Sequence, residues 1–367
     1  MPDLRLYAAA IVIAGAIAAA GSLLGLVPCG RDNRTAANRW NRHRITRLIW
    51  LALAVVAGWW TLAILPQWPP RNGLERLLVL ALPAAVLLEF CLGSLDGPPP
   101  GDRPVPWDRL GRRIAWALFA AAFVPTLLYG SVHLQVASPE SGSPHFALIT
   151  RGLLGILLAI ALEKQRGWLL RLERHTADGS VRVGLGLAVG ATALLILFGG
   201  YLKGGAAALP LAAAILGGAL PTLGARPTSF VSGDSSTSGN SSTGVVSDSG
   251  VVSVAVIALA GWLVVGTSFG NVGVWPALVT WLAPLLAAAP DWLGIASSSN
   301  GRRRLARVSL RIALVAAPLA CVLTLAYREF EQKYRPFTQL DSRPPRDATR
   351  LTVNSGPGRI RATDSSQ

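Results

Sequence analysis

The chain alternates between long apolar stretches and short polar connections that are mostly basic. A membrane-spanning helix needs roughly 17–25 mostly apolar residues, because each residue adds about 1.5 Å across a hydrocarbon core of about 30 Å. The stretches of that length run over residues 6–28, 48–66, 77–95, 114–133, 146–162, 183–201, 205–223, 250–268, 273–293 and 309–327. This pattern predicts an all-α fold, a polytopic bundle of about ten spanning helices.

The basic residues are distributed unevenly between alternate connections. The connections after the first, third, fifth, seventh and ninth stretches hold 20 Lys and Arg, whereas the N-terminus and the other connections hold 4. Positively charged connections stay in the cytoplasm. The bias therefore predicts that the N-terminus lies outside, and it supports the helix count independently of hydropathy.

Two domains are expected, a transmembrane domain over residues 1–327 and a polar tail over 328–367. The tail is rich in Pro, Gly, Ser and Arg and poor in large apolar residues, which predicts disorder. This orientation places the tail outside despite its net positive charge, and an error of one helix would place it inside. The first stretch also has an alternative interpretation as a cleaved signal peptide, which the arginines that follow it disfavour.

Composition narrows the class of protein. Hydrophobic residues make up 51% of the 367 residues and charged residues only 14%, against roughly 25% in soluble domains. A net charge of +15 would suggest nucleic-acid binding in a soluble protein, but here the charge lies in short connections between apolar stretches. No nucleic-acid partner is expected. The expected partners are the lipid bilayer and the anionic lipid head groups that face the arginine-rich inner connections.

Glu89 is the most informative single residue, because it falls well inside the 77–95 stretch. A buried ionised carboxylate is costly, so Glu89 should face the bundle interior, a water-filled cavity or a basic partner, or else be protonated. Arg151 sits inside the 146–162 stretch, where it either extends its guanidinium to the interface or pairs with Glu89. We take Glu89 and Arg151 as candidates for a substrate or ion pathway, with buried packing as the alternative for Glu89.

Other patterns indicate structure. Asp291 and Arg311 fall near helix ends and could pair there with each other or with the arginines at 302–304. Residues 164–175 either lie along the inner membrane surface or extend the preceding helix. Gly186 and Gly190 form a G-x-x-x-G pair that favours close packing against the next helix.

No catalytic centre is evident. The sequence contains no P-loop, no H-E-x-x-H motif, no paired cysteines and no concentrated set of carboxylates, so no catalytic, cofactor-binding or metal-ligating residue is expected. An enzyme is the less favoured hypothesis. The leading hypothesis is a transporter or permease-like protein of unknown substrate, and the alternative is a non-catalytic membrane scaffold, assembly partner or sensor. Abundant alanine and arginine suggest a GC-rich bacterial genome, hence the bacterial inner membrane.

Overall fold

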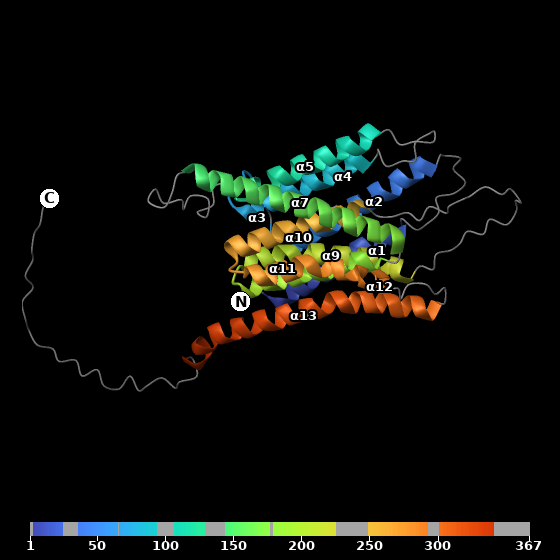
Figure 1. Cartoon of the computed structure of the whole chain (residues 1–367). Coiled ribbons are helices and arrows are strands. Elements are labelled where there is room, and N and C mark those ends of the chain that lie inside the picture. The colour runs from blue at the N-terminus through green and yellow to red at the C-terminus, as the bar shows by residue number, and fades with distance from the viewer. Residues whose placement is uncertain are drawn as a thin grey trace, which may run out of the picture. The chain divides into compact units, whose positions relative to one another are not determined.

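The computed structural model describes most of the chain, and every regular element in the described part is a helix (Figure 1). The described residues are 3–24, 36–64, 66–93, 106–128, 144–176, 179–224, 249–292 and 301–340. The helices are α1 (Leu4–Leu24), α2 (Ala36–Thr61), α3 (Gly73–Arg76), η1 (Leu77–Ala81), α4 (Leu82–Gly93), α5 (Pro106–Leu128), α7 (Pro144–Thr176), α8 (Ser180–Phe198), α9 (Leu202–Gly224), α10 (Ser249–Phe269), α11 (Val274–Leu282), η3 (Ala283–Ala288), α12 (Ala289–Trp292) and α13 (Gly301–Leu340). The all-α prediction is confirmed for these residues.

Seven helical stretches in the described residues are long and apolar enough to cross a membrane. They are Leu4–Leu24, Leu110–Leu128, Ser180–Phe198, Leu202–Leu223, Gly250–Phe269, Val274–Asp291 and Leu305–Lys333. This number is compatible with a membrane-embedded protein. The predicted stretches 48–66, 77–95 and 146–162 correspond to helices in α2, η1–α4 and α7, but these are not among the seven. Ten spans and an external N-terminus stay predictions.

Several helices are longer than the apolar stretches that predict them. Helix α2 already begins at Ala36, α5 begins at Pro106 and α7 continues to Thr176. Many arginines that the sequence assigns to connecting loops are therefore helical. Residues 164–175 extend the preceding helix, which is the second of the two interpretations that the sequence allows. Hydropathy misses these ends because charged residues can continue a helix beyond the hydrocarbon region.

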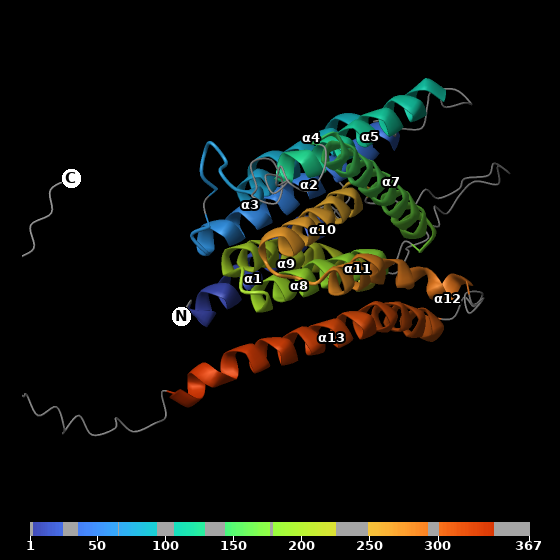
Figure 2. The same ribbon diagram turned by 60° about the vertical axis from the view of Figure 1, so that its left-hand side comes forward.

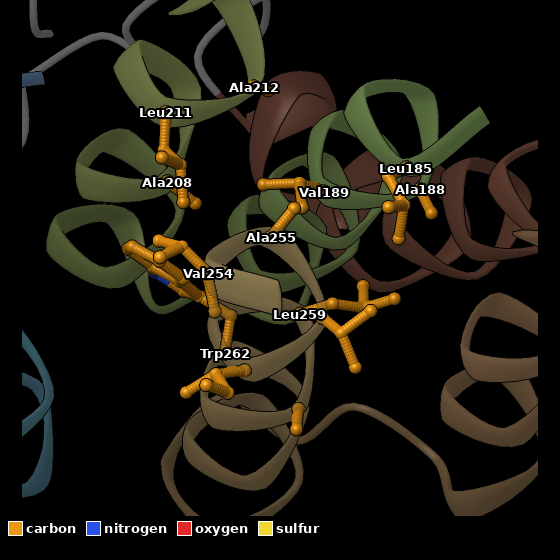
Figure 3. Close-up of a cluster of buried hydrophobic side chains, with 14 of the residues drawn as sticks. Leu185, Ala188, Val189, Ala208, Leu211, Ala212, Val254, Ala255, Leu259 and Trp262 are labelled. Atoms are coloured by element: carbon orange, nitrogen blue, oxygen red, sulfur yellow. The ribbon is translucent and has the colours of Figure 1, made fainter. Parts of the chain in front are cut away.

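Helix α10 forms the centre of the core. It contacts α8 and α9 as well as α4, α5 and α7 (Figures 1 and 2). All its side chains from Val252 to Ala260 are buried, as expected of a helix that is hydrophobic on every face. Figure 3 shows the buried side chains that α8, α9 and α10 contribute, with Trp262 at one end of the labelled α10 residues. The Trp262 indole N–H donates to the Gly204 carbonyl at 3.1 Å, which satisfies a buried polar group.

Helices α8 and α9 form a tight helical hairpin. Gly200 turns the chain with φ 90°, a conformation that favours glycine. Gly186 lets α8 approach α9, as predicted, because an added Cβ would lie 2.7 Å from the Leu216 side chain. A Cβ on Gly190 would meet Ala212 at 3.7 Å, an ordinary contact distance, so the predicted role of Gly190 in close packing is not evident. Gly217 instead packs against Gly15 of α1.

Two helical runs are irregular. The run from α3 to α4 contains the wide π-turn η1, and the run from α11 to α12 contains the tighter 3₁₀ segment η3. Such changes of winding within a helix are frequent at functional sites. The η1 turn precedes the helix that carries Glu89.

The chain divides into two compact units, Met1–Ala326 and Tyr327–Gln367. Helix α13 continues through residues 328–340, so this part of the predicted tail is helical. Residues 341–367 lie outside the described part, where the predicted disorder stays a prediction.

Candidate functional site

Glu89 lies on α4 and is buried, with only 4% of its surface exposed. It stands four residues before the end of α4 at Gly93, about 6 Å along the helix axis. This position is nearer a helix end than the 77–95 stretch implies. The cost of burying a carboxylate must still be offset by partners.

Two arginines from distant helices supply those partners. The Arg44 guanidinium of α2 donates both to the Glu89 carboxylate and, at 2.9 Å, to the Glu89 backbone carbonyl. Arg166 of α7 places Nη1 3.5 Å from the other carboxylate oxygen. Of the environments expected for Glu89, the structure thus shows the basic partner, and two arginines fill this role. The role of Glu89 in a substrate or ion pathway stays a prediction.

Arg166 is held from several directions. Its Nε and Nη2 donate to the two carboxylate oxygens of Glu163 at 3.0 and 3.1 Å, a bidentate pair one helical turn away. Nη1 reaches the Ser253 hydroxyl of α10 at 3.4 Å. The guanidinium also lies over the Trp116 ring of α5, 4.4 Å from its centroid, in cation–π geometry. Arg166 therefore links α4, α5, α7 and α10.

These side chains enclose a small cavity between α2, α4, α5 and α7. Its lining residues are Arg44, Glu89, Leu92, Arg112, Trp116, Arg166, Leu170 and Arg174. The volume is about 20 Å³, room for about one water molecule. Among the described residues that line it, four are arginines and one is a glutamate, and Glu163 adds a second acid because it binds Arg166, so the net charge around the cavity is positive. Such a site favours anions.

Arg151, the second predicted pathway residue, belongs to α7, but its side chain lies outside the described residues. The suggested pair between Arg151 and Glu89 stays a prediction. The partners of Glu89 that the structure shows are Arg44 and Arg166, both of which the sequence assigns to loops.

Two more ion pairs lie near the arginine-rich helix ends. Arg182 at the start of α8 donates to Glu173 of α7 at 2.8 Å, with both side chains buried. Arg182 also lines a second cavity of about 20 Å³, together with Arg47 and Ser22. The predicted pair of Asp291 and Arg311 is confirmed, with Nη2 2.5 Å from Oδ1. Each pair links two helices that follow each other in the chain. Both pairs lie near helix ends where arginines are concentrated.

At the other end of the α3–α4 run, Glu75 lies in a separate polar group. It lies 14 residues before Glu89, about 21 Å along a helix. A hydrogen bond from the Arg71 backbone N–H holds the pKa of Glu75 below its usual range, Lys203 at 3.6 Å acts in the same direction, and burial opposes both.

A scan of protein-family models finds no match, and no curated protein or solved structure is significantly similar to this chain.

The sequence identifies Glu89 but misses the site around it. Its partners come from positions 45 residues before and 77 residues after it, which no local pattern connects. One signal was present: Glu163 and Arg166 are spaced i,i+3, the spacing of neighbours on a helix face. That spacing indicates that α7 continues past its apolar part and presents Arg166 on a defined face.

Proposed function

We propose that this chain is a multi-pass transporter or permease-like protein with about ten spanning helices and an external N-terminus, and that its arginine cluster receives an anion. The observation that carries the proposal is the cavity formed by Arg44, Glu89, Arg112, Arg166 and Arg174, where arginines outnumber the acid among the lining residues. Four helices meet there, so a change in their packing would change access to the charge. Localisation to a bacterial inner membrane belongs to the same proposal and rests on composition alone.

The alternative, a non-catalytic scaffold or sensor, is favoured by the size of the cavity. A volume of about 20 Å³ holds little more than a water molecule, so transport requires the helices to separate. A scaffold needs no such opening. Access from both sides of the membrane therefore distinguishes the two functions.

Leu92→Cys, in a background without the native cysteines, tests that access. Leu92 lines the cavity but carries no charge, so its replacement leaves the ion pairs intact. Ala85→Cys is the matched control, since Ala85 lies on the same helix and is fully buried. An impermeant thiol reagent is applied to each side of sealed vesicles.

We expect Leu92→Cys to react from both sides and Ala85→Cys from neither. Reaction of Leu92→Cys from one side only would contradict transport and favour the sensor or scaffold. Reaction from neither side, in protein shown to be folded, would exclude an anion-accessible cavity.

A further inference from the structure

A hydrophobic groove lies beside the arginine cavity, on the same seam between α2 and α4. It is lined by Leu51, Ala52, Val55, Val56, Trp59, Leu78, Leu82, Pro83, Val86, Leu87, Leu211 and Val254. Its volume is about 340 Å³, within the range of roughly 300–1,000 Å³ typical of small-molecule sites. Ala52, Val56 and Leu87 are exposed, so the groove is open on its outer side. In a membrane, that side faces lipid.

The groove and the cavity follow each other along both helices. On α2, Arg44 precedes Leu51 by seven residues and Val55 by eleven, spacings close to whole helical turns that place the three on one face. On α4, Val86 lies one turn from Glu89. The charged end of the seam thus passes directly into its apolar part.

The dimensions match one leaflet of a bilayer. Arg44 and Val55 are separated by about 16 Å along α2, roughly half of a hydrocarbon core of about 30 Å. A molecule with an anionic head at the arginines and an acyl chain in the groove would therefore lie at the depth of a membrane lipid. A free inorganic anion would use only the charged end.

We propose that this seam binds an acidic phospholipid, with its phosphate at the mouth of the arginine cavity and one acyl chain in the groove. The phosphate lies beside Arg112, which is half-buried, and Arg174, which is exposed, because both line the cavity and reach its surface. Arginine suits phosphate because its planar guanidinium offers paired donors. The inference rests on the proposed function, since the same cluster must receive an anion, and it names the anion's class.

Two matched pairs of variants test it. Ala52→Trp fills the groove, whereas Leu53→Trp places the same side chain on the next residue of α2, which is exposed and does not line the groove. Arg174→Gln removes a charge from the cavity, whereas Arg171→Gln removes an exposed charge from the same helix outside the cavity. All four replaced residues are exposed, so the folded state should be retained.

The measurement is native mass spectrometry of the full chain released from detergent containing phosphatidylglycerol or phosphatidylcholine with identical chains. We expect the wild type to retain phosphatidylglycerol about tenfold more strongly. Ala52→Trp and Arg174→Gln should each weaken that retention about tenfold, and their controls should match the wild type. Equal retention of the two lipids, or equal behaviour of Ala52→Trp and Leu53→Trp, would overturn the lipid site.

A second measurement asks whether inorganic phosphate protects Leu92→Cys from the impermeant thiol reagent. It distinguishes failure of the lipid site from failure of the proposed function. One outcome is that phosphate protects Leu92→Cys, that Arg174→Gln abolishes this protection, and that both lipids are retained equally. This outcome would support an anion site and overturn the lipid site. Selective retention of phosphatidylglycerol with labelling from one side only supports the lipid site and contradicts transport.

Discussion

At the residue scale, the feature that most constrains this protein is a single carboxylate shared by two buried arginines. Arg44 and Arg166 are each only 6% exposed, so removing the charge they share leaves two buried cations without it. Breaking a buried ion pair from one side is strongly destabilising, whereas replacing both partners can be neutral. The cost of altering Glu89 therefore comes mainly from the arginines that remain.

Glu89→Gln should lower the free energy of unfolding by about 3 kcal/mol. Glu163→Gln is the control, because Glu163 also binds Arg166 but its side chain is 31% exposed, and its loss should be below about 1 kcal/mol. Denaturant unfolding in detergent measures both. Equal losses in the two variants would show that burial does not set the strength of these pairs.

At the element scale, close approach of helices depends on particular glycines. A Cβ on Gly217 of α9 would lie 2.2 Å from the Gly15 carbonyl oxygen of α1, which is backbone and cannot rotate away. A Cβ on the adjacent Gly218 would meet only the Ser22 hydroxyl, at 3.4 Å. The two neighbouring glycines therefore differ in whether the helix contact leaves room for an added methyl group.

Gly217→Ala should destabilise the protein by about 1–3 kcal/mol, because α1 and α9 must separate. Gly218→Ala should be neutral or slightly stabilising, since alanine favours the helix over glycine by about 1 kcal/mol. Thermal unfolding of the two variants side by side makes the comparison. Similar midpoints would contradict the assigned α1–α9 contact.

Hydropathy predicts the helical segments well at this scale but not where they end. The apolar stretch beginning at Leu48 locates α2, yet the helix starts at Ala36, because nothing in hydropathy distinguishes a charged helical turn from a loop. Helix α7 likewise runs past Glu163 to Thr176. The Glu89 partners lie on these extensions, which is why the candidate acid could be identified from sequence and its arginines could not.

At the scale of the whole molecule, orientation is the property that the sequence predicts and that topology experiments can test. The charge bias places the connection containing Arg71 outside and the end of α7 containing Arg171 inside. Both residues are exposed. An odd number of crossings must separate them.

Arg71→Cys should react with an impermeant thiol reagent only from outside, and Arg171→Cys only from inside. Sealed right-side-out and inverted vesicles of a variant without native cysteines provide the measurement. Reaction of both positions from the same side would mean that one predicted crossing between them does not exist. Opposite sides in the reverse sense would instead place the N-terminus in the cytoplasm.

The wide turn η1 determines the direction in which Glu89 points. Successive residues of an α-helix are rotated by about 100° around its axis, and a π-turn accommodates one residue more than an α-turn. If Leu77–Ala81 wound as a regular α-helix, every side chain of α4 beyond it would shift in azimuth by roughly that angle. The carboxylate would then swing off Arg44 and Arg166. The winding of this one turn, about 12 Å from Glu89 along the axis, would therefore control whether the buried carboxylate meets its arginines.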